Sequence, residues 1–339
     1  MNRCLVALVV AASAVAACTP RGPSPGPGPE PAGTGTPQTP TATARPPTST
    51  AWQRLPPAPT ARTEVTAASD GERVLVIGGF VEAGQATVAT VEVYDPAARA
   101  WRAGPDLPIA VNHAMAASLD GTVYVVGGYR GPGLRDPSDR AFRLAGDRWE
   151  ELPRMPQPRA AAGAAGLAGR LYVAGGVGPD GLADRLLVFD PDAASWSTVE
   201  GPPTPREHLG VAAADGRLFA VGGRTGGIGT NLAAAEAYDP AAGAWQRLAD
   251  LPTPRGGFAA TATADGLVVT AGGEEAAGTF DEVEAFDPRT GAWRSLPPLP
   301  TARHGLGVTA VGTVVFVIAG GPQPGFAFSA ANEALQLAP

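Results

Sequence analysis

The three histidines of the chain are the residues whose type and spacing most directly suggest chemistry. His113, His208 and His304 each lie seven residues before the position at which a predicted turn begins, namely Asp120, Asp215 and Val311. Three imidazoles at one register of a repeated structure could converge on an axis, where they would hold a zinc ion or an anion, or line a pocket for a polar ligand. We expect the polar pocket, with the three histidines as ligand-binding residues and with no resident metal or other cofactor. Plain structural packing of the three side chains is the alternative.

Counting seven residues back from the predicted turn also identifies candidates in the other three repeats. These are Thr63, Ala161 and Phe258, of which Thr63 and Phe258 join the predicted ligand-binding set. An arginine recurs close to this register, at Arg62, Arg159, Arg206, Arg255 and Arg303, whereas the second repeat has Asn112. Arg206 is included as a ligand-binding candidate. Because a glutamate recurs later in four of these five repeats, at Glu92, Glu236, Glu284 and Glu333, buried ion pairs are the other explanation of the arginines.

The positions of the two cysteines indicate where in the cell the protein is located. Cys4 lies in a segment with an early Arg3 and an apolar run over residues 5–17, which has the length of a signal-peptide core and is too short to span a bilayer. The run ends in Val-Ala-Ala-Cys at residues 15–18, which resembles the lipobox of bacterial lipoproteins. The resemblance implies that residues 1–17 are a lipoprotein signal peptide and that Cys18 is lipidated. An ordinary secretory signal followed by a chance cysteine is the alternative.

A lipidated Cys18 predicts a protein anchored to a lipid bilayer of the bacterial cell envelope, outside the cytoplasm. Since no thiol follows Cys18, this excludes disulfides, cysteine-ligated metals and cysteine catalysis in the mature chain. Residues 18–50 are mostly Pro, Gly and Thr after the cysteine, so we expect a disordered linker that cannot bury enough apolar surface to fold. The formal net charge is -7, which speaks against nucleic acid as a partner.

The elements that position the candidate residues follow from internal repetition. The chain has 45 Gly and 36 Pro among 339 residues, which argues against a mainly helical protein. Gly pairs fall at 78/79, 127/128, 175/176, 222/223, 272/273 and 320/321, with a period of 47 to 50 residues, and the six Trp residues keep the same period. A β-rich run precedes each pair, and an aromatic-Asp-Pro turn follows in four of the six repeats. Each repeat therefore predicts four short strands.

A hydrophobic run, Gly-Gly, aromatic-Asp-Pro, Trp and Leu-Pro at this spacing resembles the kelch repeat. The resemblance covers residues 51–337 and implies an all-β, six-bladed β-propeller with four-stranded antiparallel blades. Small residues in the first strand of each repeat suit the crowded centre of such a ring. We expect one domain over residues 51–339, in which residues 51–56 complete the last blade and close the ring.

The kelch resemblance favours a binding or interaction module over an enzyme. We expect a polar partner, either a glycan or an envelope protein, because the predicted loops are rich in Gly and mixed in charge. The copper-radical oxidases that contain kelch blades need a cysteine cross-linked to a tyrosine, which the mature chain does not offer. The alternative is a sugar mutarotase or epimerase that resembles the sialic-acid mutarotases, which are six-bladed kelch proteins of bacterial envelopes.

Overall fold

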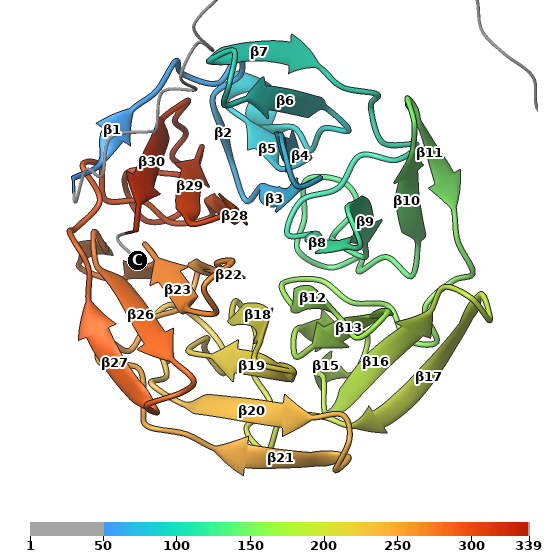
Figure 1. Ribbon diagram of the computed structural model, residues 1–339. Coiled ribbons are helices and arrows are strands. Elements are labelled where there is room, and N and C mark those ends of the chain that lie inside the picture. Colours follow the sequence, from blue (N-terminus) through green and yellow to red (C-terminus); the bar gives the residue numbers. More distant parts are fainter. Residues whose placement is uncertain (1–50, 338–339) are drawn as a thin grey trace, which may run out of the picture. The chain divides into compact units, whose positions relative to one another are not determined.

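The computed structural model describes residues 51–337, which form a ring of six four-stranded antiparallel sheets around a central channel (Figure 1). The predicted six-bladed, all-β propeller is thereby confirmed. The predicted signal peptide, the lipidation of Cys18 and the linker of residues 18–50 lie outside the described residues. Within residues 51–337 there is no helix long and apolar enough to cross a membrane.

Blades 1 to 5 are each continuous in sequence and run from the channel outwards. Blade 1 consists of β3 (Thr66–Ser69), β4 (Val74–Ile77), β6 (Val91–Asp95) and β7 (Ala100–Ala103), and blade 2 of β8 (Met115–Leu119), β9 (Thr122–Val126), β10 (Ala141–Ala145) and β11 (Arg148–Glu151). Blade 3 consists of β12 (Gly163–Leu167), β13 (Arg170–Ala174), β16 (Arg185–Asp190) and β17 (Ser195–Glu200). Blade 4 consists of β18 (Gly210–Ala214), β19 (Arg217–Val221), β20 (Ala235–Asp239) and β21 (Ala244–Arg247), and blade 5 of β22 (Ala259–Ala262), β23 (Val268–Ala271), β26 (Val283–Asp287) and β27 (Ala292–Ser295).

Blade 6 joins the two ends of the described chain. Its strands are β28 (Gly307–Val311), β29 (Val314–Ile318), β30 (Asn332–Gln336) and, as the outer strand, β1 (Gln53–Arg54). Gln53 pairs with Ala334 and Arg54 with Glu333. The first strand therefore covers an edge of β30 that would otherwise stay unpaired.

Shorter elements lie in the connections between the blade strands. They are the strand pairs β2 (Arg62–Thr63) with β5 (Phe80–Val81), β14 (Val177–Gly178) with β15 (Gly181–Leu182), and β24 (Glu274–Glu275) with β25 (Gly278–Thr279), together with the 3-10 helix η1 (Ala83–Gln85). In β2–β5 and in the bridges equivalent to it, the residue three positions before an innermost strand pairs with the residue after a Gly pair or, in blade 6, with Gly321. This pairing places two sets of side chains from every blade at one end of the channel.

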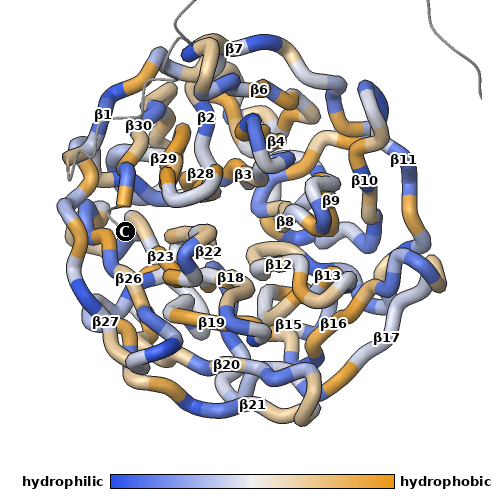
Figure 2. Tube along the Cα trace, in the orientation of Figure 1, coloured by the Kyte–Doolittle hydropathy of each residue, from blue (hydrophilic) through white to orange (hydrophobic). Residues whose placement is uncertain are grey.

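The core lies between neighbouring blades. Apolar positions (orange) recur along the middle strands, and hydrophilic ones (blue) are frequent on outer strands such as β27 (Figure 2). Each Trp indole N–H donates to a backbone carbonyl at the end of the outer strand of the preceding blade or just after it: Trp52 to Pro297, Trp101 to Pro56, Trp149 to Pro105, Trp196 to Pro153, Trp245 to Glu200 and Trp293 to Ala249, at 2.7–2.9 Å. In three of these contacts, at Pro56, Pro153 and Pro297, the acceptor is the proline of a Leu-Pro pair, so there the periodic Trp and Leu-Pro form one contact between blades.

The Gly pairs are required by close backbone approach. Gly127 has φ +65°, and a Cβ there would lie 2.3 Å from the carbonyl oxygen of Arg159 in the next blade. Gly128 then donates its N–H to that same carbonyl at 2.8 Å. In blade 6 the two left-handed positions are Ala319 and Gly320, so the repeat there is shifted by one residue relative to the Gly pair 320/321.

The recurring arginines form buried ion pairs within their blades. The pairs are Arg62–Glu92, Arg206–Glu236, Arg255–Glu284 and Arg303–Glu333, with nitrogen–oxygen distances of 2.6–2.8 Å. Arg159, which has no such glutamate, donates instead to Gln157 Oε1 and to the carbonyl of Arg185. Val111, rather than Asn112, stands at the arginine position of blade 2, because it is Val111 that lies four residues before the first strand.

Candidate functional site

A ring of six left-handed residues surrounds the end of the channel at which the innermost strands begin, which we call the mouth. The mouth ring consists of Glu64, His113, Ala161, His208, Gly257 and Gly305, each two residues before an innermost strand and each with φ between +50° and +69°. Backbone N–H groups donate from each blade to the preceding one, from His113 to Glu64 and onward, and Val65 closes the circle by donating to Gly305. Every blade needs this backbone shape, and side chains at these positions meet around the mouth.

The predicted common register of the three histidines is wrong for His304. His113 and His208 are members of the mouth ring, but His304 is one residue earlier, beside Gly305. Thr63 is also one residue before the ring and Phe258 one residue after it. The count fails for His304 because Val311 is the last residue of its strand, so the turn of blade 6 begins one residue later, at Gly312. Thr63 lies before the ring because the first strand of blade 1 has four residues, whereas the first strands of blades 2 and 4 have five.

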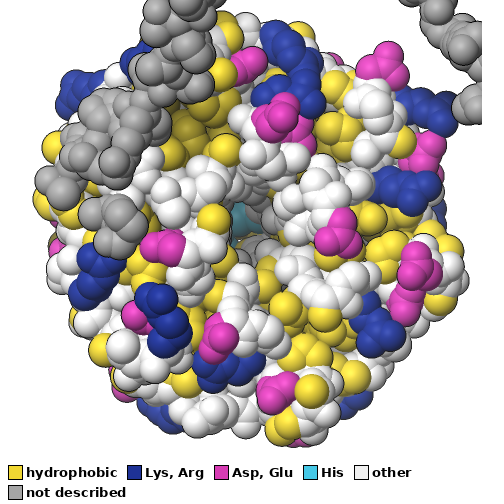
Figure 3. Space-filling view, in the orientation of Figure 1, with side chains coloured by type: hydrophobic (Ala, Val, Ile, Leu, Met, Phe, Trp, Pro, Cys, Tyr) yellow, Lys and Arg dark blue, Asp and Glu magenta, His cyan; other side chains and the backbone are white. Residues whose placement is uncertain are grey.

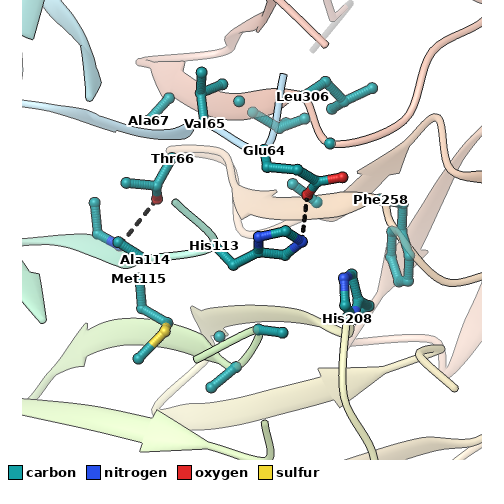
Figure 4. Close-up of a pocket in the computed structure, with 18 of the residues that line it drawn as sticks. Glu64, Val65, Thr66, Ala67, His113, Ala114, Met115, His208, Phe258 and Leu306 are labelled. Carbon is teal, nitrogen blue, oxygen red and sulfur yellow. Dashed lines mark hydrogen bonds and ion pairs between the residues drawn. The ribbon is translucent and has the colours of Figure 1, made fainter. Parts of the chain in front are cut away.

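Glu64, His113 and His208 come together at the mouth although they belong to three blades (Figure 4). His113 Nε2 lies 3.1 Å from Glu64 Oε2. The rings of His113 and His208 are nearly perpendicular, with centroids 4.9 Å apart. One potential ligand atom of each of the three residues lies within 4.8 Å of the other two.

A second set of charged groups surrounds this trio. His304 Nδ1 lies 3.2 Å from Glu64 Oε1 and 3.5 Å from Glu274 Oε2. Arg224 donates from Nη1 to Glu274 Oε1 at 2.9 Å and from Nε to Glu207 Oε1 at 3.3 Å. Arg224 and Glu274 both directly follow a Gly pair, so the repeat delivers them to the same end of the channel.

Burial and neighbouring charges shift the pKa values of His113, Glu64 and His304 in different directions. Burial lowers the pKa of His113 to about 4, against the opposing charge of Glu64, which keeps the imidazole neutral at neutral pH. Burial raises the pKa of Glu64, but the imidazoles of His113 and His304 outweigh it and hold the pKa well below its usual range. Burial also lowers the pKa of His304, yet the hydrogen bond to Glu64 and the charges of Glu64 and Glu274 outweigh it, so the net shift is upward.

The mouth contains a pocket, which we call the mouth pocket. Its apolar wall consists of Phe80, Leu134 and Phe326, with the rings of Phe80 and Phe326 packed edge to face. Its polar wall consists of Thr63, Glu64, His113, Arg224, Glu274 and His304. In the space-filling view the channel opens at the centre of the ring, and histidine (cyan) is visible inside it (Figure 3).

The remaining predicted site residues lie in different surroundings. Arg206 is fully buried within blade 4, where it pairs with Glu236, so it lies outside the candidate site. Phe258 lines the channel but packs mainly between blades 4 and 5, where its ring fills the space that a Cβ at Gly210 or Gly222 would need. Thr63 lines the mouth pocket with its side chain buried.

Sequence reasoning missed Glu64 and Glu207 altogether. Alignment of the repeats on the residue four positions before each first strand, rather than on the turns, would have placed Glu64 with His113 and His208, and Glu207 with Asn112 and His304. The position directly after each Gly pair would also have indicated residues of the mouth, since it is occupied by Arg224 and Glu274 in two of the repeats.

Comparison with known proteins agrees with this architecture. The model of the KLHDC2/KLHL20/DRC7 Kelch-repeats domain matches residues 112–321, and the Kelch motif model matches residues 61–108. Among solved structures, that of YjhT is similar, with a TM-score of 0.69, 18% sequence identity, and coverage of 82% of this chain and 95% of that chain. At this identity the likeness shows the fold alone. No curated protein matches the sequence.

Proposed function

Because the chain belongs to the kelch-repeat family, in which propellers commonly serve as interaction modules, we propose that it is an envelope-anchored module whose mouth pocket binds a sugar unit of a glycan. One observation carries the proposal. Within residues 51–337, Leu134 and Phe326 are the large apolar side chains that stay exposed, at 49% and 51%, and both line the mouth pocket. An apolar patch that is left open beside buried charged groups marks a ligand site.

The chemistry of the pocket suits a sugar. A pyranose has apolar C–H faces that pack against an aromatic ring, and hydroxyls that both donate and accept hydrogen bonds. Phe326 offers the ring, Glu274 offers carboxylate acceptors, and Arg224 offers donors. An envelope protein is the alternative polar partner. It would insert a single polar side chain into the same pocket.

The proposed location depends on residues 1–18. The apolar run and the lipobox-like Val-Ala-Ala-Cys support a lipid anchor at Cys18. The linker of residues 18–50 would then hold the propeller away from the bilayer, where its mouth could meet a glycan of the envelope.

A glycan array tests the proposal, with the wild-type chain and Phe326→Ser compared on the same array. We expect defined glycans to bind the wild type and Phe326→Ser to lose at least about tenfold in affinity by calorimetry, which is about 1.4 kcal/mol. Thr261→Ala, at the opposite end of the channel, is the matched control and should bind normally. Binding that is unchanged in Phe326→Ser would refute a site at the mouth.

A mutarotase is the second candidate, and it too is supported by a specific observation. Glu64 and His304 face each other at 3.2 Å in the mouth pocket, which places a carboxylate that can accept a proton beside an imidazole whose raised pKa favours the form that can donate one. Mutarotation needs such a pair to take a proton from the anomeric hydroxyl and to give one to the ring oxygen. NMR of anomer exchange in a bound sugar would test it, because catalysis should accelerate exchange and should be lost in Glu64→Gln.

A further inference from the structure

The hydrogen bonds of Asn112 determine which nitrogen of His113 carries the proton. Asn112 Nδ2 donates to Thr87 Oγ1 at 2.9 Å and to the carbonyl oxygen of Gly131 at 3.2 Å. Because a carbonyl only accepts, the amide nitrogen must face Gly131, and the amide oxygen must face His113. Asn112 Oδ1 lies 2.7 Å from His113 Nδ1, so Nδ1 is the protonated nitrogen.

This tautomer leaves two acceptors in contact. With the proton on Nδ1, Nε2 of a neutral His113 carries a lone pair, and it lies 3.1 Å from the carboxylate oxygen Oε2 of Glu64, which also only accepts. Two lone pairs at this distance need a cation between them. A metal ion bound by both atoms would supply one. A second proton on His113 would supply one as well, and the zinc titration below distinguishes the two.

His208 completes a set of three ligands. Its Nδ1 lies 3.4 Å from Glu207 Oε2, which favours the proton on that nitrogen and leaves Nε2 free. One ligand atom each from Glu64, His113 and His208 lie within 4.8 Å of one another. We propose that these three side chains bind a divalent transition-metal ion, and two imidazole nitrogens with one carboxylate oxygen match Zn²⁺ with an open fourth position.

The surroundings fit a metal centre. Asn112 accepting from His113 Nδ1 and Glu207 beside His208 Nδ1 are the partners that orient metal-binding histidines. The cluster is also acidic: three carboxylates, of Glu64, Glu207 and Glu274, face one guanidinium, of Arg224, and the imidazole of His304.

The backbone of the mouth ring explains how the three side chains converge. All six ring positions have left-handed φ, and blades 5 and 6 use Gly257 and Gly305 there. The four other positions are Ala161, Glu64, His113 and His208, so three of the four side chains in the ring are potential ligands. A Cβ at Gly305 would lie 2.7 Å from the Glu64 carboxyl, so the glycine leaves the room that this carboxylate occupies.

Zinc binding to the full chain tests the proposal, and the test is independent of any glycan. The protein is freed of metal with a chelator and titrated with Zn²⁺ by calorimetry. We expect one ion per chain. Glu64→Gln and His113→Ala should each weaken binding by at least about 100-fold, and Asn112→Ala by about 10- to 100-fold, because it only orients a ligand. His304→Gln, the matched control, should change the affinity by less than about tenfold, since His304 faces the other oxygen of Glu64.

Any of three results would overturn the proposal, the last two of them from variants. One is the absence of binding at about 1 mM Zn²⁺, a concentration at which even a weak site would fill. The others are a Glu64→Gln variant that binds like the wild type, and a His304→Gln variant that loses the ion, which would instead indicate a three-histidine site. Circular dichroism and melting of each metal-free variant show whether it is folded. Co²⁺ in the wild type gives a second measurement that needs no variant, since intense visible absorption is expected from a four-coordinate site.

Discussion

The buried pair of Arg206 and Glu236 offers the sharpest test of how the blades are stabilised. Arg206 Nη1 donates to Glu236 Oε2 at 2.7 Å, and Nη2 donates to the carbonyl of Ala220 at 2.7 Å. Thr204 Oγ1 donates to the other carboxylate oxygen at 2.8 Å. The side chains of Arg206 and Glu236 are 0% and 2% exposed, so neither charge can turn to solvent if its partner is removed.

Glu236→Gln leaves the guanidinium of Arg206 buried without an opposite charge. We expect it to lower the free energy of unfolding by about 3–5 kcal/mol, the cost of breaking a buried ion pair from one side. The double variant Arg206→Met with Glu236→Leu removes both charges and should lose less than the single variant, despite the carbonyl of Ala220 left without a donor. Equilibrium urea denaturation measures all three chains.

The matched control is Asp250→Asn, which breaks the exposed pair of Asp250 with Arg247, in which the side chains are 51% and 67% exposed. Stability should scarcely change, because water screens this pair. The argument would be refuted if Glu236→Gln cost less than about 1 kcal/mol, or if the double variant were the less stable of the two. The double variant should also retain ligand binding at the mouth, since Arg206 does not line the mouth pocket.

Three further predictions concern the ring and its anchor. Deleting residues 51–56 removes β1 together with the half-buried Trp52 and Leu55, and should cost about 3 kcal/mol in urea denaturation and promote aggregation through the exposed edge of β30; equal stability would exclude a role in closing the ring. Gly127→Ala should cost at least about 2 kcal/mol, and Gly146→Ala only about 1 kcal/mol, because both have φ +65° but only the first adds a clash; similar melting temperatures would contradict the close approach. Cys18→Ser should release the protein from the membrane fraction or leave it unprocessed, and a variant that still fractionates with lipid would contradict the anchor.

The fold could be predicted from the sequence because each repeated residue meets a local structural requirement, and that requirement recurs from blade to blade. Gly127 is needed for a backbone approach, and Trp149 for a hydrogen bond to the preceding blade. Such requirements recur wherever two blades meet, so their period appears directly in the sequence.

The candidate site could be predicted only in part. His113 and His208 were identified, and their place at the mouth follows from the repeat. Glu64 was missed because the first strand of blade 1 is one residue shorter than those of blades 2 and 4, and His304 was placed in the wrong register because Val311, where the count began, still belongs to its strand. The protonation of His113 depends on Asn112 and on the carbonyl of Gly131, which lies in a loop that does not repeat. Contacts of that kind leave no period in the sequence.

A crystal structure of the protein with its strongest glycan from the array tests the central claim most directly. The account predicts the sugar in the mouth pocket, with its apolar face on Phe326 and its hydroxyls within hydrogen-bond distance of Arg224 or Glu274. A sugar bound at the opposite end of the channel, near Thr261, or on the outer strands of the blades would contradict it.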